Sequence, residues 1–364
     1  MKFRCERDVL VEALGSAGRA VSTRGGAMPV LSGIRAQLTG NELQLTGSDT
    51  DLTIEVTITV NGENDGLVVL PGRLAAEIVR ALPAGAVVVD IDEEEARITS
   101  GRAEFTIRIL PAEEYPRLPE PAGDPLTIAA SELSAALKQV VPAASSDDAR
   151  PILTGVLLAS EEGGLRLVAT DSYRLAVRDL PGAAVLSEGQ HVLVPSRALS
   201  ELARVLAGAE NVELRLGERD ASFQVGSIRL TTRLIEGEFP NYRGLIPASY
   251  PNRLTVGREA LLEAVRRVKL MAREATPVRM VMRTDGLELV AITQDVGQAH
   301  EELDAKYEGT ELTVAFNPEY LLDGVEVTPG DEVVVSTLDA LKPAVIRSTD
   351  GGEFLYLLMP VRVS

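Results

Sequence analysis

The feature that most constrains the fold is a threefold internal repeat. Residues 45–49 recur as 167–171 and, more weakly, as 291–295, and the aspartates that end these segments are 122 and 124 residues apart. Residues 110–116 match residues 234–240 at the same offset of 124. Because several coincidences share one spacing, the sequence predicts three tandem copies of one domain. Their expected ranges are 1–121, 122–249 and 250–364.

Each copy is predicted to combine two helices with antiparallel strands. An extended segment at 2–5, 125–129 or 253–256 leads into a stretch whose apolar residues fall at i, i+3 and i+4, the spacing of an amphipathic helix. A second helix is expected after Pro71, Pro195 and Pro318, since proline is tolerated at the start of a helix. Alternating apolar residues elsewhere predict strands. The expected fold class is therefore α+β, with two helices packed on antiparallel sheets in each copy.

Composition narrows the function and the compartment. The net charge is −18, which argues against loose nucleic-acid binding over the whole surface, because such binding depends on Lys and Arg neutralising phosphates. The single cysteine, Cys5, excludes an intrachain disulfide and Cys-rich metal sites, and it suits a reducing cytosol. The N-terminal residues lack the apolar run of a signal peptide, and no segment approaches 18 consecutive apolar residues. We expect a cytoplasmic protein with no membrane partner.

Enzyme signatures are sparse. The chain contains no Gly-x-Gly-x-x-Gly motif, no phosphate-binding loop and no Gly-x-Ser-x-Gly elbow. Its two histidines, His191 and His300, belong to different copies. The acidic run 90–95 lacks the glycine-punctuated spacing of a calcium loop, so an acidic hairpin turn is the favoured interpretation. We predict no catalytic residue, no cofactor and no metal site.

One stretch of the second copy differs from its counterparts. Residues 165–169 alternate as in a half-buried strand, and residues 170–172 are a polar run suited to a tight turn. Tyr173, Arg174 and Leu175 then resume the strand and present a ring, a guanidinium and an aliphatic group together. The equivalent turns of the other copies have no Tyr-Arg pair. The pattern indicates a shared structural turn that only the middle copy uses for recognition.

Arginines recur on the predicted second helices. The matching positions, each 124 residues apart, are Arg73, Glu77 and Arg80 in copy one and Arg197, Glu201 and Arg204 in copy two. One interpretation is a solvated face with i,i+4 ion pairs. The alternative is that successive helices present arginine to a common channel. The third copy has Glu319 and Asp323 in the corresponding helix instead, so the pattern is not uniform.

The chain resembles a known family, that of the bacterial DNA polymerase III β subunit, the sliding clamp. The resemblance covers the whole chain and rests on segments that keep their order and spacing: Thr46-Gly47-Ser48-Asp49, Ser100-Gly101-Arg102, residues 169–177, Phe239-Pro240-Asn241-Tyr242 and Met359-Pro360-Val361-Arg362. It implies a non-catalytic processivity factor, a head-to-tail homodimer that closes into a ring of six similar domains with pseudo-six-fold symmetry. Helices would line a hole around double-stranded DNA, which an acidic chain could hold by topology and weak, sequence-independent phosphate contacts.

The resemblance also implies three sets of site residues. The DNA-contacting set is Arg24, Arg73 and Arg150, to which the repeat argument adds Arg197. The partner-peptide pocket would bind short motifs of the DNA polymerase III α subunit, the clamp loader and other clamp-binding proteins of replication and repair, and its residues are Leu153, Thr170, Ser172, Tyr173, Arg174, Leu175, Pro240, Leu245, Pro343, Leu357, Met359, Pro360 and Val361. The dimer interface would pair Phe105 and Ile107 with Leu270 and Met271. Ser172 and Tyr173 stand where members of the family often have Gly and His.

Two other classes of function stay open from the residues alone. A repeat-built scaffold could bind peptides without encircling DNA. This alternative would be favoured if mutation of Arg24, Arg73 and Arg150 to Glu left loading on circular DNA unchanged. A metal-dependent hydrolase assembled from scattered carboxylates would show turnover that requires a divalent metal. The clamp is the leading hypothesis.

Overall fold

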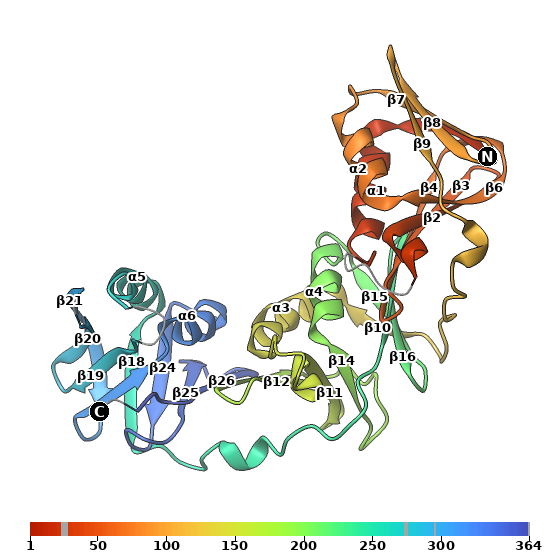
Figure 1. The fold of residues 1–364 in the computed structure, drawn as a ribbon. Coiled ribbons are helices and arrows are strands. Elements are labelled where there is room, and N and C mark those ends of the chain that lie inside the picture. Colours follow the sequence, from red (N-terminus) through yellow and green to blue (C-terminus); the bar gives the residue numbers. More distant parts are fainter. Residues whose placement is uncertain (23–27, 273–275, 295, 363–364) are drawn as a thin grey trace. The chain divides into compact units, whose positions relative to one another are not determined.

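The protein is described from a computed structural model, which covers residues 1–364 except for 23–27, 273–275, 295 and 363–364 (Figure 1). The described residues form six α-helices, and these are α1 (Arg7–Gly18), α2 (Gly72–Ala81), α3 (Ala130–Val140), α4 (Ser196–Val205), α5 (Arg258–Lys269) and α6 (Pro318–Val327). Each repeat therefore contains two helices, and the second of each pair begins at or directly after the proline that predicted it. In α6 the Asn317 side chain also caps the helix, because its Oδ1 accepts the Glu319 amide at 2.9 Å.

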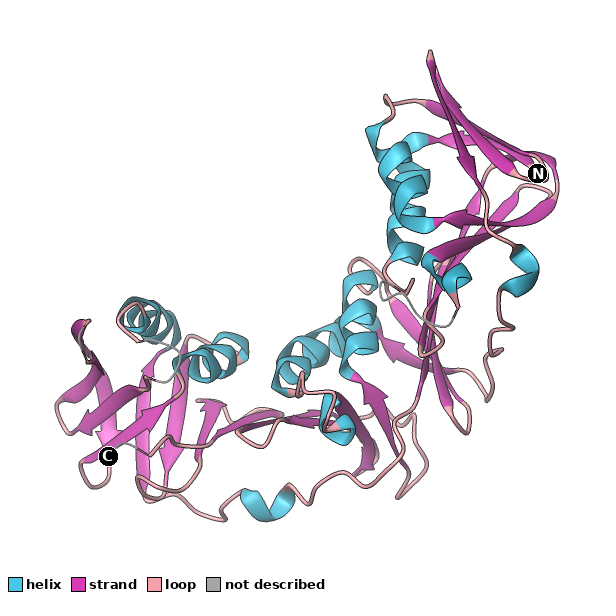
Figure 2. Cartoon of the chain, viewed as in Figure 1, coloured by secondary structure: helices cyan, strands magenta, loops and turns pink. Residues whose placement is uncertain are grey.

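Contacts divide the chain into two compact units. Unit 1 is Met1–Ser131 with Ser200–Leu234, and unit 2 is Glu132–Leu199 with Ile235–Ser364. Each unit thus contains part of the second repeat. The reason is that strands of one repeat pair with strands of the next. All strand pairs in the described sheets are antiparallel. Figure 2 shows these strands in magenta.

Unit 1 contains a five-stranded sheet in the order β5-β1-β7-β8-β9 and an eight-stranded sheet in the order β10-β15-β16-β17-β4-β3-β2-β6. The strands of the first are β5 (Asn61–Asn64), β1 (Lys2–Glu6), β7 (Ala86–Ile91), β8 (Glu95–Ser100) and β9 (Ala103–Arg108). Those of the second are β10 (Leu126–Ala129), β15 (Asn211–Leu216), β16 (Asp220–Val225), β17 (Ile228–Arg233), β4 (Leu52–Thr59), β3 (Glu42–Ser48), β2 (Gly33–Thr39) and β6 (Gly66–Pro71). The repeats join where β17 pairs with β4, with Leu230 opposite Ile54.

Unit 2 contains a nine-stranded sheet in the order β14-β11-β12-β13-β26-β25-β24-β18-β22 and a four-stranded sheet in the order β21-β20-β19-β23. The strands of the first are β14 (His191–Pro195), β11 (Gly155–Glu161), β12 (Gly164–Thr170), β13 (Arg174–Leu180), β26 (Phe354–Leu358), β25 (Ala344–Ser348), β24 (Glu332–Thr337), β18 (Asn252–Gly257) and β22 (Ala305–Glu308). Those of the second are β21 (Gly297–Leu303), β20 (Gly286–Thr293), β19 (Val278–Arg283) and β23 (Leu312–Phe316). Here the second and third repeats join where β13 pairs with β26.

Short 3₁₀ segments lie in the connections, and they are η1 (Pro29–Ser32), η2 (Ala112–Glu114), η3 (Val141–Ala143), η4 (Pro151–Thr154) and η5 (Arg243–Leu245). The core is mainly aliphatic, since only 4% of the residues are aromatic, with Leu14, Ile54 and Leu133 among its fully buried side chains. Tyr356 is the largest of these side chains and lies between β26 and α6, where its hydroxyl donates to the Tyr320 carbonyl at 2.8 Å. This contact fixes α6 against the strand that joins the second and third repeats.

Candidate functional site

The predicted recognition stretch is a tight turn between β12 and β13. Asp171 holds the turn, since its Oδ1 accepts the amides of Tyr173 at 2.9 Å and Arg174 at 3.0 Å. The Thr170 hydroxyl closes it by donating to the Arg174 carbonyl at 2.7 Å. Ser172 has a φ of +81°, a left-handed conformation that non-glycine residues rarely adopt. The strand resumes at Arg174, one residue later than predicted, because these bonds keep Tyr173 in the turn.

Arg174 connects this turn to helix α6 of the third repeat. Its Nε donates to Asp171 Oδ2 at 3.1 Å, and one Nη donates to Asp323 Oδ2. The guanidinium carbon lies 4.2 Å from the centre of the Tyr320 ring, in the geometry of a cation–π contact. Tyr173 also stacks on Tyr320, with 6.5 Å between the two ring centres. Tyr173 nevertheless remains 58% exposed and is available to a ligand.

The apolar members of the predicted pocket meet next to this turn. Leu175 pairs with Leu357 across β13 and β26, and the Met359 amide donates to the Tyr173 carbonyl at 2.9 Å. The structure brings these residues into one apolar cluster with part of the segment that connects the second and third repeats. The cluster includes Leu157, Val168, Leu175, Tyr242, Leu357, Phe239, Ile246 and Met359. Leu175 and Leu357 are each 1% exposed, so they form the floor of this site rather than its rim.

The other predicted pocket residues lie on neighbouring segments. Leu153 belongs to η4, Leu245 ends η5 and is 46% exposed, and Pro240 lies in the same connecting segment as Leu245. Pro343 directly precedes Ala344, which pairs with Leu358, so it lies beside the end of β26. Pro360 and Val361 follow this strand, and the Val361 amide donates to the Ala315 carbonyl at 2.8 Å.

Sequence reasoning missed three residues of this site: Tyr320, Asp323 and Tyr356. Each supports the turn from the third repeat, through the cation–π contact, the ion pair to Arg174 and the bond to the Tyr320 carbonyl. One signal was available. The predicted arginine pattern is replaced in this helix by acidic residues, and Asp323 is the acid that pairs with Arg174.

Among the predicted DNA-contacting residues, Arg73 is exposed on α2, and its Nε donates to Glu77 at 2.9 Å. The ion-pair interpretation of that helix face is therefore correct for this pair, and it does not exclude contact with a phosphate. Arg197 is exposed at the start of α4. Arg24 lies outside the described residues.

Arg150 has a different environment from these residues. Its Nε donates to Asp147 Oδ2 at 3.0 Å, its Nη1 to the Asp171 carbonyl at 3.2 Å and its Nη2 to the Ser145 hydroxyl at 3.3 Å. The amide of Ala149 and then the guanidinium of Arg150 lower the pKa of the Asp147 carboxyl, so this partner stays ionised. Arg150 is thus tied to the predicted peptide site as well as being predicted to contact DNA.

The predicted dimer residues lie at two separate places. β9 is an edge strand of its sheet, as expected, and Phe105 on it is 40% exposed. Ile107 is only 7% exposed, so it packs within unit 1. In unit 2, Leu270 directly follows α5 and is 83% exposed, and Met271 next to it is half-buried.

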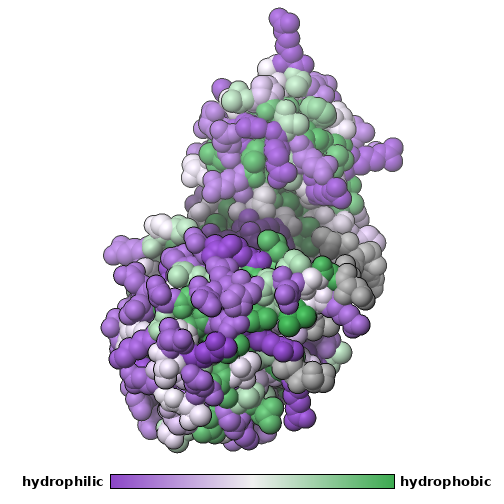
Figure 3. Space-filling view, turned by 90° about the vertical axis from the view of Figure 1, so that its left-hand side faces the viewer, coloured by the Kyte–Doolittle hydropathy of each residue, from purple (hydrophilic) through white to green (hydrophobic). Residues whose placement is uncertain are grey.

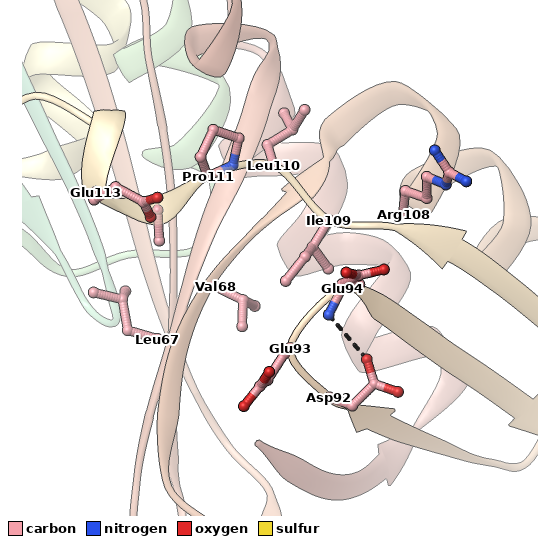
Figure 4. Close-up of a pocket in the computed structure, with 11 residues that line it drawn as sticks. Leu67, Val68, Asp92, Glu93, Glu94, Arg108, Ile109, Leu110, Pro111 and Glu113 are labelled. Atoms are coloured by element: carbon pink, nitrogen blue, oxygen red, sulfur yellow. Dashed lines mark hydrogen bonds between the residues drawn. The ribbon is translucent and has the colours of Figure 1, made fainter.

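The acidic run 90–95 spans the end of β7, a hairpin turn at residues 92–94 and the start of β8. Asp92 Oδ1 accepts the amides of Glu94 at 3.0 Å and Glu95 at 2.9 Å, and these two bonds lower the pKa of its carboxyl. A hollow of about 650 Å³ lies beside the turn, between β6 and the segment that follows β9 (Figure 4). Figure 4 shows the carboxylates of Glu93 and Glu113 on opposite sides of it. In the part of the chain that the structure describes, no group of three His, Cys, Asp or Glu residues could hold a metal ion.

One face of the molecule is mostly hydrophilic, as the net charge of −18 suggests. Figure 3 shows hydrophilic residues over much of the face nearest the viewer, with smaller hydrophobic areas between them. None of the helices formed by the described residues is long and apolar enough to cross a membrane. The fold and this site together define a repeat-built protein in which a turn of the second repeat and a helix of the third are joined by direct contacts.

The comparisons with known proteins give the family. Models of the DNA polymerase III beta subunit match along the chain, the N-terminal domain at residues 1–119, the central domain at 127–241 and the C-terminal domain at 243–362. The beta sliding clamp of Streptomyces coelicolor is 35% identical over 381 residues, with both chains covered completely, and that of Staphylococcus aureus is 33% identical over 376 residues, covering 100% of this chain and 99% of the relative.

Solved structures agree with these relatives. The DNA polymerase sliding clamp of Bacillus subtilis has a TM-score of 0.93 at 32% identity, and the sliding clamp of Bartonella birtlesii bound to griselimycin has 0.93 at 33%, each with both chains fully covered. The chain belongs to the DNA polymerase III beta subunit family, the bacterial sliding clamps. It is accordingly a DNA sliding clamp for DNA polymerase III, a non-catalytic processivity factor that works with DNA and polymerase-related partners.

Proposed function

We propose that the chain pairs head to tail with a second copy and closes into a ring around duplex DNA. The clamp domains are residues 1–121, 122–249 and 250–364, so that a homodimer contains six. The observation that carries this proposal is that the two units expose unlike apolar side chains, Phe105 on the edge strand β9 of unit 1 and Leu270 after α5 of unit 2. An interface between unlike ends is heterologous, and two such contacts can close a ring. Pairing would also cover the free edge of β9.

The DNA contact is proposed to be weak and independent of sequence. Arg24, Arg73, Arg150 and Arg197 would meet phosphates, while the net charge of −18 keeps the rest of the surface from holding DNA tightly. Arg73 supports this role because its side chain is 90% exposed and the carboxylate that it pairs with, Glu77, is an exposed i,i+4 neighbour. Such surface pairs are worth at most about 1 kcal/mol, so a phosphate can compete for the guanidinium.

The turn at 170–175 and the apolar cluster beside it are proposed to bind short peptide motifs. The partners are the DNA polymerase III α subunit, the clamp loader and other clamp-binding proteins of replication and repair. Tyr173, Leu245 and Val361 are exposed, while Leu175 and Leu357 are buried in the apolar cluster. Half-buried Met359 adds an adaptable side chain, which suits a site that accepts several peptides. Because it would encircle chromosomal DNA, we propose that the protein is cytoplasmic and associated with the nucleoid.

The ring is tested on nicked circular DNA. The purified protein is loaded with a clamp loader and ATP, and the DNA is then sedimented before and after it is linearised. We expect a dimer that stays with the circle and leaves the linear form, because a ring slides off the ends. Leu270→Glu should give a monomer that is not retained. The matched control is Leu67→Glu on β6, which places the same charge at another exposed leucine of 44% exposure and should leave both results unchanged.

Two outcomes would contradict the proposal. A wild-type chain that is monomeric at micromolar concentration cannot form this ring. Retention that survives linearisation would indicate direct binding rather than topological linkage, and a peptide-binding scaffold would then be the better description.

A further inference from the structure

A continuous set of contacts runs through the recognition turn from the segment after α3 to helix α6. It begins at Arg150, whose three donors reach Asp147, Ser145 and the backbone carbonyl of Asp171. It continues through the Asp171 side chain to Arg174 and ends at Asp323 and Tyr320. All of these residues lie within unit 2. The turn is therefore held from both sides by groups distant in sequence.

The central residue of this set is buried. Asp171 is 6% exposed, and each of its oxygens has a partner: Oδ1 accepts two amides of the turn, Oδ2 accepts Arg174, and the carbonyl accepts Arg150. A buried carboxylate or carbonyl oxygen that lost its donor would be costly, so the turn depends both on the donors to the Asp171 carboxylate and on Arg150, the donor to its carbonyl. Arg150 is the donor that comes from outside the turn and its strands.

The turn also carries a backbone conformation that needs such support. Ser172 has a φ of +81°, and a non-glycine residue in this region costs of order 1–3 kcal/mol unless its surroundings fix it. Tyr173, which is 58% exposed, follows directly. The position of its ring depends on how firmly the turn is held.

The contacts of Arg150 indicate a role besides binding phosphate. Three of the five N–H groups of a guanidinium are used here, and the Asp147 carboxylate lies beside the charge. Arg73, in contrast, has one carboxylate partner and a side chain that is 90% exposed, against 40% for Arg150. The two arginines that resemblance places in one DNA-contacting set are thus in different structural situations.

We propose that Arg150 is a positioning residue of the peptide site: by holding the Asp171 carbonyl, it keeps the 170–174 turn in the conformation that binds peptides. Asp323 does the same from the other side through Arg174. This inference rests on the proposed peptide-binding function and extends it, because it predicts that peptide affinity depends on Arg150 in the absence of DNA.

The test measures binding of a fluorescein-labelled peptide that carries the clamp-binding motif of the DNA polymerase III α subunit, by anisotropy and without DNA. We expect Arg150→Ala to weaken binding about three- to tenfold, the effect of losing hydrogen bonds to a buried group. Arg150→Lys should weaken it similarly, since an ammonium beside Asp147 keeps the charge but lacks the fork that reaches Ser145 and the Asp171 carbonyl together. The matched control is Arg283→Ala, in the same unit, where a half-exposed arginine is paired with Glu288 at 3.1 Å.

Two further measurements separate positioning from general destabilisation. Hydrogen exchange should become faster in residues 170–175 of Arg150→Ala, with α5 and β19 unchanged. In a double-mutant cycle, Arg150→Ala and Asp323→Asn should be non-additive, because both act through the same turn. Additive losses would mean that the two residues act independently.

The proposal fails if Arg150→Ala binds the peptide as tightly as wild type, or if Arg150→Lys restores affinity, which would show that charge alone matters. It also fails if Arg283→Ala loses as much affinity as Arg150→Ala. Failure of the peptide-binding function itself is recognised separately, because the wild-type protein would then not bind the labelled peptide at all.

Discussion

Two glycines in helices provide a test of the packing between α6 and β26. Gly324 lies within α6, where a Cβ would come within 2.3–2.8 Å of three atoms of the Tyr356 ring. Gly15 lies within α1, where a Cβ would have nothing within 4 Å. Alanine is the better helix former by about 1 kcal/mol at both positions, so the same substitution should act in opposite directions.

The expected magnitude follows from the room available to the ring. Ordinary contacts of a Cβ are 3.4–4 Å, so the Gly324→Ala methyl and the ring must separate by more than 1 Å. Tyr356 is 1% exposed and pairs with Ala176 on one side and Ile346 on the other, which leaves it little freedom to move. Overpacking of this kind costs about 1–3 kcal/mol. With the severe contact at the upper end and the helix gain subtracted, we expect a net loss of about 2 kcal/mol.

The assay is thermal unfolding by circular dichroism, together with hydrogen exchange of α6 and β26. Gly324→Ala should unfold several degrees below wild type, and exchange should rise in both elements. Gly15→Ala should unfold slightly above wild type. The reasoning is refuted if Gly324→Ala is as stable as Gly15→Ala, since α6 would then not press against the Tyr356 ring.

Three other predictions concern the surface and the one thiol. Tyr173→Ala should weaken peptide binding about tenfold, measured by anisotropy. The unfolding midpoint should change little, because the ring is exposed and contributes to the stability of the fold mainly by stacking on Tyr320. Arg73→Glu should shorten the retention of the loaded protein on circular DNA at moderate salt, whereas Arg97→Glu, a 58% exposed control on β8, should not. Burial raises the pKa of Cys5 from 9.0 to about 11, so thiol labelling at pH 8 should be about 100-fold slower in the folded protein than in urea from the thiolate fraction alone. The folded state favours the protonated thiol, so the stabilisation from the buried Cys5 thiol is complete below pH 9 and is lost as the pH rises from 9 towards 11. Equal labelling rates in the folded protein and in urea would contradict the burial of Cys5.

The sequence predicted the local structure well because helix and strand signals are local. Apolar spacing and the prolines at Pro71, Pro195 and Pro318 placed the helices, and the offset of 124 residues revealed the repeats. It did not reveal that contacts group the chain into two units that each contain part of the second repeat. That grouping comes from strand pairing between repeats, β17 with β4 and β13 with β26, and such pairing between distant segments leaves no periodic signal in either strand.

The local structure of the candidate site was also predictable from the sequence, but the contacts that support it were not. The turn, its exposed tyrosine and the apolar strand behind it follow from the stretch 165–177 and its resemblance to the family. The supporting residues do not, because an ion pair such as Arg174–Asp323 joins positions that are 149 residues apart. Arg150 shows the opposite limit: resemblance gave it a DNA role, while only the structure shows that it also holds the Asp171 carbonyl.

The equivalent turns of the first two repeats show what changed between them. In both, an aspartate holds the turn through its Oδ1: Asp49 accepts the amides of Asp51 at 3.1 Å and Leu52 at 2.8 Å, as Asp171 does for Tyr173 and Arg174. The next residue has nearly the same left-handed φ, +80° at Thr50 and +81° at Ser172. The backbone is therefore common to the repeat and cannot by itself make a recognition site.

The difference lies in where the side chains of the turn find partners. In the first repeat, Leu52 follows the turn and is buried in the core, so that turn only connects two strands. In the second, Arg174 occupies the position of Leu52 and reaches Asp323 and Tyr320 of the third repeat. Substituting Asp323 with Asn should therefore weaken peptide binding at a turn from which it is distant in sequence, while the equivalent turn of the first repeat keeps its hydrogen-exchange protection. If both turns responded alike, the support from the third repeat would not be what distinguishes them.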